Sequence, residues 1–169
     1  MNAFRSGLIA ALIALAAGAP SAPSQSLGSF TQKQQVANRD AVTYLFPEQV
    51  TAPAGKPAQV ELHFRVAQGL HINSHTPADD FLIPTAFSIP ANAHVELKGV
   101  TYPPGVITTL PVDPKTKLSV YTGEFVIRAR IVAAAGNHLV RGQLHYQACD
   151  NNECMPPKTI PVSIDVIGR

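Results

Sequence analysis

Residues 59–67 alternate between apolar and polar side chains, and this pattern limits the local structure more than any other feature of the chain. A repeat of two residues is the period of a β-strand, because successive side chains point to opposite faces. One face would hold Val60, Leu62, Phe64 and Val66, and the other Gln59, Glu61, His63, Arg65 and Ala67. The stretch predicts a half-buried strand between a core and water.

Similar short patterns recur along the chain. They lie at residues 42–46, 85–89, 95–98, 124–133, 139–147 and 160–166, with a short extended piece at 71–75. Fifteen prolines and eleven glycines are spread between these segments, so turn signals come about every ten residues. We therefore predict an all-β, immunoglobulin-like antiparallel β-sandwich of about seven or eight strands. Pro161 predicts an edge position for the last strand, because proline cannot donate to a ladder.

Residues 102–118 form the least regular interior stretch, with prolines at 103, 104, 111 and 114. We predict a long loop there. Loops of about fifteen residues in compact domains are often covers or binding segments.

The amino terminus has the order of a secretory signal peptide. Arg5 precedes an apolar run from Leu8 to Ala17, which is too short to span a bilayer. We expect a signal peptide over residues 1–25 with cleavage between about 19 and 26, a flexible lead-in over 26–40, and one domain over 41–169. The compartment would then be oxidising.

Charge excludes several classes of partner. Charged residues are 14% of the chain, with 13 Lys and Arg against 11 Asp and Glu and no long run of one sign. Neither nucleic acid nor an anionic membrane surface is therefore expected as a partner.

The chain has two cysteines, Cys149 and Cys154. A disulfide between them would close a loop of about six residues and stabilise the fold by roughly 2 kcal/mol, which a domain with a full core hardly needs. Two cysteines so close in a turn-rich segment favour exchange with another thiol. Asp150 and Glu153 flank them, and their negative charge disfavours the thiolate.

Two alternatives stay open at this point. The disulfide could be structural, in a non-catalytic immunoglobulin-like binding module. The cysteines could also join His145, His71 and His75 in a copper(I) or zinc site, although no compact ligand spacing accompanies them. His63, His94 and His138 are interpreted as surface histidines.

Two segments carry a family resemblance. The first is Tyr146-Gln147-Ala148-Cys149 with Cys154-Met155-Pro156-Pro157, and the second is Gly69-Leu70-His71-Ile72-Asn73-Ser74 with Phe81-Leu82-Ile83-Pro84-Thr85. Together they resemble the amino-terminal periplasmic domain of the thiol:disulfide interchange protein DsbD, also known as the disulfide-bond-corrector domain. The likeness runs from about residue 42 to residue 166, which is nearly the whole expected domain.

The resemblance implies an immunoglobulin-like fold and a periplasmic role without a cofactor. Such a domain accepts electrons from a thioredoxin-like module and passes them to thioredoxin-fold partners, including disulfide isomerases or cytochrome-maturation proteins. Carried over by position, Cys154 would form the mixed disulfide and Cys149 would resolve it. Residues 106–120 would match the family's cap loop. The residues expected to line the site are Tyr146, Gln147, His71, Asn73, Pro156 and Pro157.

Three features depart from the family pattern. Four residues separate the cysteines, whereas the best-studied type has five. Residues 106–120 contain no phenylalanine, so Leu110, Leu118 or Tyr121 would have to replace the aromatic cap. No membrane-spanning electron conductor follows the domain in this sequence, so we expect the reductant to come from a separate protein, such as a separate membrane conductor. We also expect a monomer.

Overall fold

The computed structural model describes residues 40–91, 94–111 and 113–169. The chain divides into two units, Met1–Asn38 and Arg39–Arg169. The expected signal peptide and nearly all of the expected lead-in lie outside the described residues. Among the described residues there is no helix, and so none that could cross a membrane.

The described chain is built from twelve strands. They are β1 (Val42–Tyr44), β2 (Glu48–Ala52), β3 (Pro57–Val66), β4 (His71–Asn73), β5 (Ala86–Ser88), β6 (Val95–Thr101), β7 (Val106–Leu110), β8 (Asp113–Tyr121), β9 (Glu124–Ala133), β10 (Gly136–Tyr146), β11 (Ala148–Cys149) and β12 (Lys158–Gly168). They form three four-stranded sheets, in the orders β1-β3-β9-β6, β2-β12-β10-β5 and β11-β4-β8-β7.

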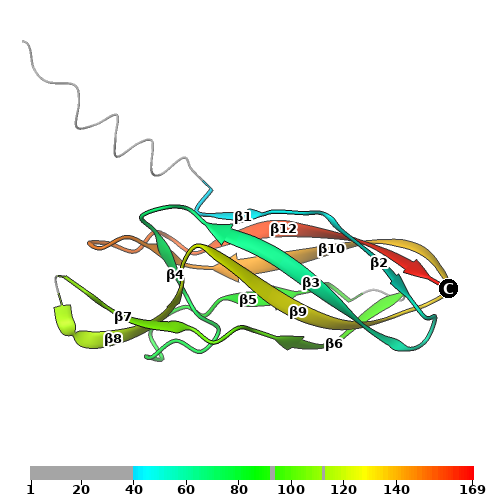
Figure 1. The fold of residues 1–169 in the computed structure, drawn as a ribbon, viewed down its shortest axis with the longest axis horizontal. Coiled ribbons are helices and arrows are strands. Elements are labelled where there is room, and N and C mark those ends of the chain that lie inside the picture. Colours follow the sequence, from blue (N-terminus) through cyan, green and yellow to red (C-terminus); the bar gives the residue numbers. More distant parts are fainter. Residues whose placement is uncertain (1–39, 92–93, 112) are drawn as a thin grey trace, which may run out of the picture. The chain divides into compact units, whose positions relative to one another are not determined.

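The strand predicted from the alternating pattern is β3, and its apolar face is buried as expected. Leu62 and Phe64 are 0% exposed, and the intervening side chains face outward. β3 pairs antiparallel with β9, and both cross in front of β10 and β12 in Figure 1. Ile127 of β9 and Ile164 of β12 join the same hydrophobic cluster. Each such side chain stabilises the fold by about 1.5–3 kcal/mol.

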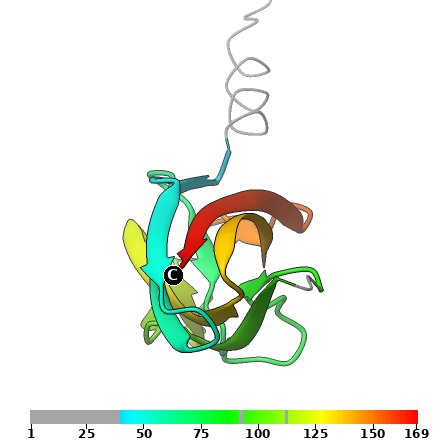
Figure 2. The ribbon, with the colours of Figure 1, turned by 90° about the vertical axis from the view of Figure 1, so that its right-hand side faces the viewer.

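The last strand does not lie at a sheet edge, so that prediction was wrong. β12 pairs antiparallel with β10 over its whole length and parallel with β2 from Ile164 onward. Figure 2 looks at the domain from the end where the chain terminates, with β2 beside β12. Pro161 lies opposite Gln143 of β10 and precedes the part of β12 that β2 covers.

The irregular loop predicted for residues 102–118 was also wrong. This stretch contains β7 and most of β8, which pair as a hairpin with a register shift near Leu110. The prolines suggested a loop, but Val106, Ile107, Thr108 and Thr109 are β-branched residues that favour a pleated strand. The hairpin joins β4 in the third sheet.

The fold class is the predicted all-β, immunoglobulin-like sandwich, although the number of strands is larger than expected. The additional strands are β2, β7, β8 and the two-residue β11. The sandwich is not purely antiparallel either, because β2 and β12 run parallel. The turn between β9 and β10 ends at Gly136, which has φ 114° and is the first residue of β10.

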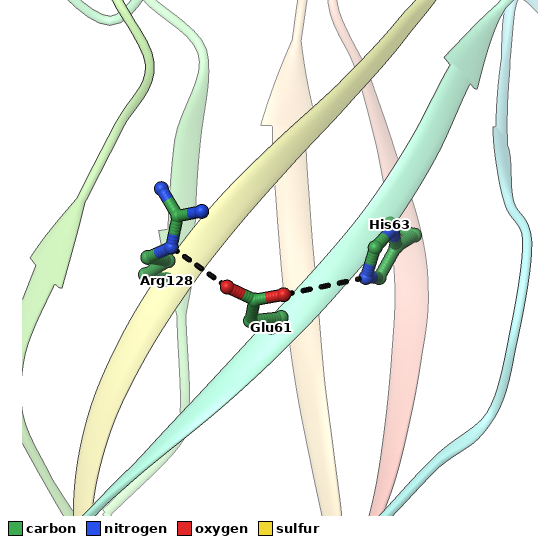
Figure 3. A network of polar contacts seen from close by, with 3 residues as sticks. All are labelled: Glu61, His63 and Arg128. Atoms are coloured by element: carbon green, nitrogen blue, oxygen red, sulfur yellow. Dashed lines mark hydrogen bonds and ion pairs between the residues drawn. The ribbon is translucent and has the colours of Figure 1, made fainter.

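Polar side chains cover the outer face of β3 and β9. Glu61 accepts a hydrogen bond from Arg128 Nε at 2.8 Å, and its second carboxylate oxygen lies 3.9 Å from His63 Nε2 (Figure 3). Exposed ion pairs such as those of Glu61 contribute at most about 1 kcal/mol.

His94, just before β6, and His138 of β10 stack with ring centroids 5.2 Å apart.

We expect Gly142→Ala to destabilise the domain by about 1–3 kcal/mol, because the core cannot accept an added methyl group there. A Cβ atom at Gly142 in β10 would lie 2.8 Å from the Phe87 ring and 3.2 Å from the Ser88 carbonyl oxygen. Gly99→Ala is the control, since its Cβ would meet only the end of Arg130, at 3.6 Å. Urea unfolding of both variants measures the difference. Equal stability of the two variants would contradict the packing at Gly142.

Candidate functional site

The two cysteines face each other across a tight turn. Cys149 ends β11 and forms an isolated antiparallel bridge with Cys154, and their sulfurs are joined in a disulfide of 2.04 Å. Their Cα atoms are 4.0 Å apart. The turn between them closes where the Asp150 N–H donates to the Glu153 carbonyl at 3.0 Å. The pair is therefore a cross-strand disulfide at the end of a very short hairpin.

The side chain of Asp150 organises this turn. One of its carboxylate oxygens accepts hydrogen bonds from the backbone N–H groups of Asn152 and Glu153, at 2.7 and 2.8 Å. On the other side of the cysteines, the Met155 N–H donates to the Ala148 carbonyl at 2.8 Å. From the sequence, Asp150 was expected to act only as a charge near the thiols. An aspartate opening a turn is nevertheless a recognisable signal for this geometry.

The two cysteines differ in exposure. Cys149 is 2% exposed, whereas Cys154 is exposed to solvent. An incoming thiolate must approach the sulfur it attacks, so it can reach Cys154 and not Cys149. The resemblance assigns Cys154 to the contact with the partner and Cys149 to resolution, and these roles stay predictions.

His71 lies directly opposite Cys149. The register of β4 and β11 pairs His71 with Cys149 and Ile72 with Ala148. Residues directly opposite each other in an antiparallel pair project from the same face. His71, Cys149 and Cys154 therefore form one row across the sheet. Ile72 projects from the other face and belongs to the hydrophobic core.

His71 is 8% exposed. Its burial lowers the pKa of the imidazole below the ordinary value of 6.5, because the charged form loses its hydration, and the carboxylate of Asp150 opposes this effect. The neutral imidazole therefore predominates near neutral pH.

Two amide side chains hold the arm that follows Cys154. The Asn73 side-chain amide donates to the Ile83 carbonyl at 3.1 Å and to Gln147 Oε1 at 3.5 Å. Gln147 in turn donates to the Met155 carbonyl at 3.2 Å. Asn73 and Gln147, both predicted to line the site, thus connect β4 to the residue after Cys154.

The other predicted lining residues lie farther from the disulfide chemistry. Tyr146 is 1% exposed within the core, opposite Lys158, and burial raises its pKa. Its hydroxyl has no hydrogen-bond partner of good geometry among the described residues, although the Val42 backbone lies near enough to favour the phenolate. Pro156 and Pro157 are exposed and connect the cysteine turn to β12. Their role stays a prediction.

The loop after β4 is fixed by contacts that sequence analysis did not identify. The Ser74 and Ser119 hydroxyls lie 2.8 Å apart in a buried hydrogen bond, and the Thr85 hydroxyl donates to the Asn73 carbonyl at 2.5 Å. His75 stacks on Tyr102 with ring centroids 3.7 Å apart. No short-range pattern reveals the long-range contacts, because their partners are distant in sequence.

A groove of about 740 Å³ lies beside the cysteine turn. Leu70 lines it from the β3–β4 connection and His71 from β4. Val106 and Leu110 line it from β7, and Asn151 from the cysteine turn. Figure 1 shows the β7–β8 hairpin and the orange cysteine turn at the same end of the domain, away from the C-terminus. The hairpin predicted as a cap thus borders the groove and leaves Cys154 exposed.

The described part of the chain holds no cluster of three or more His, Cys, Asp or Glu side chains arranged to bind a metal ion. Of the histidines considered as ligands, His75 places Nδ1 3.0 Å from the Thr85 carbonyl oxygen, and His145 places Nδ1 3.0 Å from the Thr159 hydroxyl. Only His71 lies beside a cysteine in the sheet register.

Comparison with known proteins identifies one family. A family model described as "Thiol:disulfide interchange protein DsbD, N-terminal" matches residues 41–165. A comparison with curated proteins finds no match.

Solved structures similar to this chain include two N-terminal domains. The reduced DsbD N-terminal domain of Neisseria meningitidis is 20% identical, with a TM-score of 0.45, covering 69% of this chain and 82% of that one. The N-terminal periplasmic domain of ScsB from Proteus mirabilis is 12% identical, with a TM-score of 0.47, covering 72% of this chain and 43% of that one.

We expect the stability of the oxidised protein to fall as the pH drops from about 6.5 through the lowered pKa of His71. The unfolded chain binds a proton at His71 in this window and the folded chain does not, so acid favours unfolding. His71→Gln removes this contribution and should flatten the pH dependence. Urea unfolding between pH 8 and pH 5 measures the effect, with His63→Gln as control. Parallel profiles for the wild type and His71→Gln would contradict it.

Proposed function

The chain belongs to the DsbD N-terminal domain family, and from this membership we propose that it is a thiol-disulfide interchange module that relays reducing equivalents between thioredoxin-fold partners. The observation that carries the proposal is the unequal exposure of the Cys149–Cys154 pair. One sulfur can be reached by another protein and the other is kept inside, as a relay requires.

The proposed reductive step begins with a partner thiolate. It attacks the Cys154 sulfur, forms a new intermolecular S–S bond, and breaks the Cys149–Cys154 bond, whose electron pair leaves with Cys149. A second thiol of the same partner then attacks the partner's sulfur in the mixed disulfide, and Cys154 leaves as the thiolate. The partner is oxidised to a disulfide and the domain becomes a dithiol.

The oxidative step runs through the same intermediate. The Cys154 thiolate attacks a disulfide of the next partner, and Cys149 then attacks Cys154 and restores the intramolecular bond. The electron pair of the broken bond leaves with the partner thiolate, so the partner is reduced.

A purely structural bridge has little to stabilise at this position. The turn is already closed by the Asp150 hydrogen bonds and by the Ala148–Met155 backbone bond, and Gln147 holds the outgoing arm. Opening the disulfide would leave all these contacts in place. The pair can therefore cycle without loss of the surrounding fold.

The partners we propose are periplasmic thioredoxin-fold proteins, as the family implies. The groove beside the cysteines offers an apolar side chain to such a partner, since Val106 of β7 lines it and is 59% exposed. In this proposal residues 1–25 direct the chain to the periplasm and residues 41–169 act there as a monomer. The thioredoxin-fold donor in turn receives its electrons from a separate membrane conductor.

We expect Cys149→Ser to trap a mixed disulfide through Cys154 when mixed with a thioredoxin-fold protein that keeps one active-site cysteine, activated beforehand as its disulfide with thionitrobenzoate. The Cys154 thiolate attacks the partner sulfur of that disulfide, and thionitrobenzoate leaves with the electron pair. Without Cys149 the intermediate cannot be resolved, so it accumulates and appears as a covalent adduct by mass spectrometry. Cys154→Ser is the matched control and should give no adduct, because Cys149 is buried. An absence of adduct with Cys149→Ser would refute the relay.

We also expect the reduction potential of the Cys149–Cys154 pair to lie above about −300 mV, the upper range of structural disulfides in secreted proteins. Equilibration with dithiothreitol buffers, followed by alkylation of free thiols, measures it. A lower potential would instead support the binding module with a structural disulfide.

A further inference from the structure

The buried cysteine presents a chemical problem that the exposed one does not. Cys149 must lose its proton before it can attack Cys154, because the thiolate is the nucleophile in disulfide exchange. At 2% exposure it has little contact with water. Burial and the neighbouring carboxylate of Asp150 both disfavour the charged sulfur. A nearby group that accepts the proton would remove this obstacle.

His71 is placed to be that group. It lies opposite Cys149 in the register of β4 and β11, so both side chains project from the same face of the sheet. Cβ atoms of such pairs are about 4.5–5.5 Å apart, within reach of an imidazole ring and a thiol. His71 also lines the groove, which connects it to solvent.

The charged and titratable groups around His71 leave it available as a base. From the cysteine hairpin it faces Cys149, Cys154 and Asp150. Across the groove stand Arg65 and Glu124, which form an ion pair with each other at 2.5 Å. The lining residues contributed by β7 and β8 carry no charge; they are Val106, Thr108, Thr109, Leu110 and Val120.

We propose that His71 accepts the proton of the Cys149 thiol in the step that resolves the mixed disulfide, an inference that rests on the proposed function. The Cys149 thiol gives its proton to a ring nitrogen of neutral His71, and the resulting thiolate attacks Cys154. The Cys149–Cys154 bond forms, the bond between Cys154 and the partner breaks, and the electron pair leaves on the partner thiolate. The imidazolium then releases its proton to water in the groove.

The neutral state of His71 supports this role. Burial lowers the pKa of the imidazole, so the ring can accept a proton at neutral pH. His145, the histidine nearest the cysteines in sequence, instead directs Nδ1 to Thr159. His75 stacks on Tyr102.

The test follows a single resolving step with oxidised glutathione as the probe. The reduced protein forms a glutathione adduct at Cys154, and acid quenching with mass spectrometry follows its conversion to the intramolecular disulfide. At pH 7 we expect His71→Gln to slow this conversion on the order of 10²-fold, the lower end of the range for general-base catalysis. The wild-type rate should level off above the pKa of His71. The variant's rate should keep rising until the thiol itself ionises.

His63→Gln is the matched control, because His63 lies on the outer face of β3 beside Glu61. It should retain the wild-type rate and pH profile. Formation of the adduct at exposed Cys154 is an internal control for folding and should be unchanged in His71→Gln. A His71→Gln variant that forms and resolves the adduct as the wild type does would overturn the role of His71 alone. A wild type that never forms the adduct would overturn the relay as well.

Proton NMR of the wild type supplies a second test that needs no variant. The pKa of His71 should differ between the oxidised and reduced proteins, because its titration couples to that of the Cys149 thiol only after reduction. An identical pKa of His71 in the two redox states would overturn the proposal.

Discussion

The whole candidate site depends on the backbone pairing of β4, a strand of three buried residues. One edge of β4 pairs with β11, which carries Cys149, and the other pairs with β8, which carries the β7–β8 hairpin. Ile72 anchors the strand in the core, while His71 and Asn73 project from the opposite face. This alternation joins the hydrophobic core to the chemistry, because a slip of one residue would exchange the two faces.

The cysteine turn is held by hydrogen bonds as well as by the disulfide. Asp150 fixes the turn, and the amide chain from Asn73 through Gln147 to Met155 fixes the arm that leaves it. These contacts involve neither sulfur atom. In the proposed relay, hydrogen bonds that do not involve the sulfurs limit the reorganisation that opening the S–S bond requires.

Local periodicity predicted the strands of the core well, since an alternating pattern such as that of β3 is decided within about ten residues. The sequence also identified the cysteines and the segment around His71. It could not place His71 opposite Cys149, because that register depends on pairing between distant segments. Prolines misled the analysis of the β7–β8 hairpin and of β12. A proline removes a ladder bond only where its nitrogen faces a partner strand. Whether a partner strand lies there is determined by the fold and not by the local sequence.

The unequal burial of the cysteines divides the chemistry between two positions. In the proposed relay, exposure lets Cys154 meet a partner, while the negative charge of Asp150 and Glu153 nearby disfavours its thiolate. Burial protects Cys149 from direct attack but also removes the water that would take up its proton. A histidine beside the buried sulfur can take up the proton and pass it to water in the groove, so Cys149 can stay buried and still be activated. The burial of Cys149 and its proton transfer to His71 thus both follow from the position of Cys149 in the sheet, opposite His71.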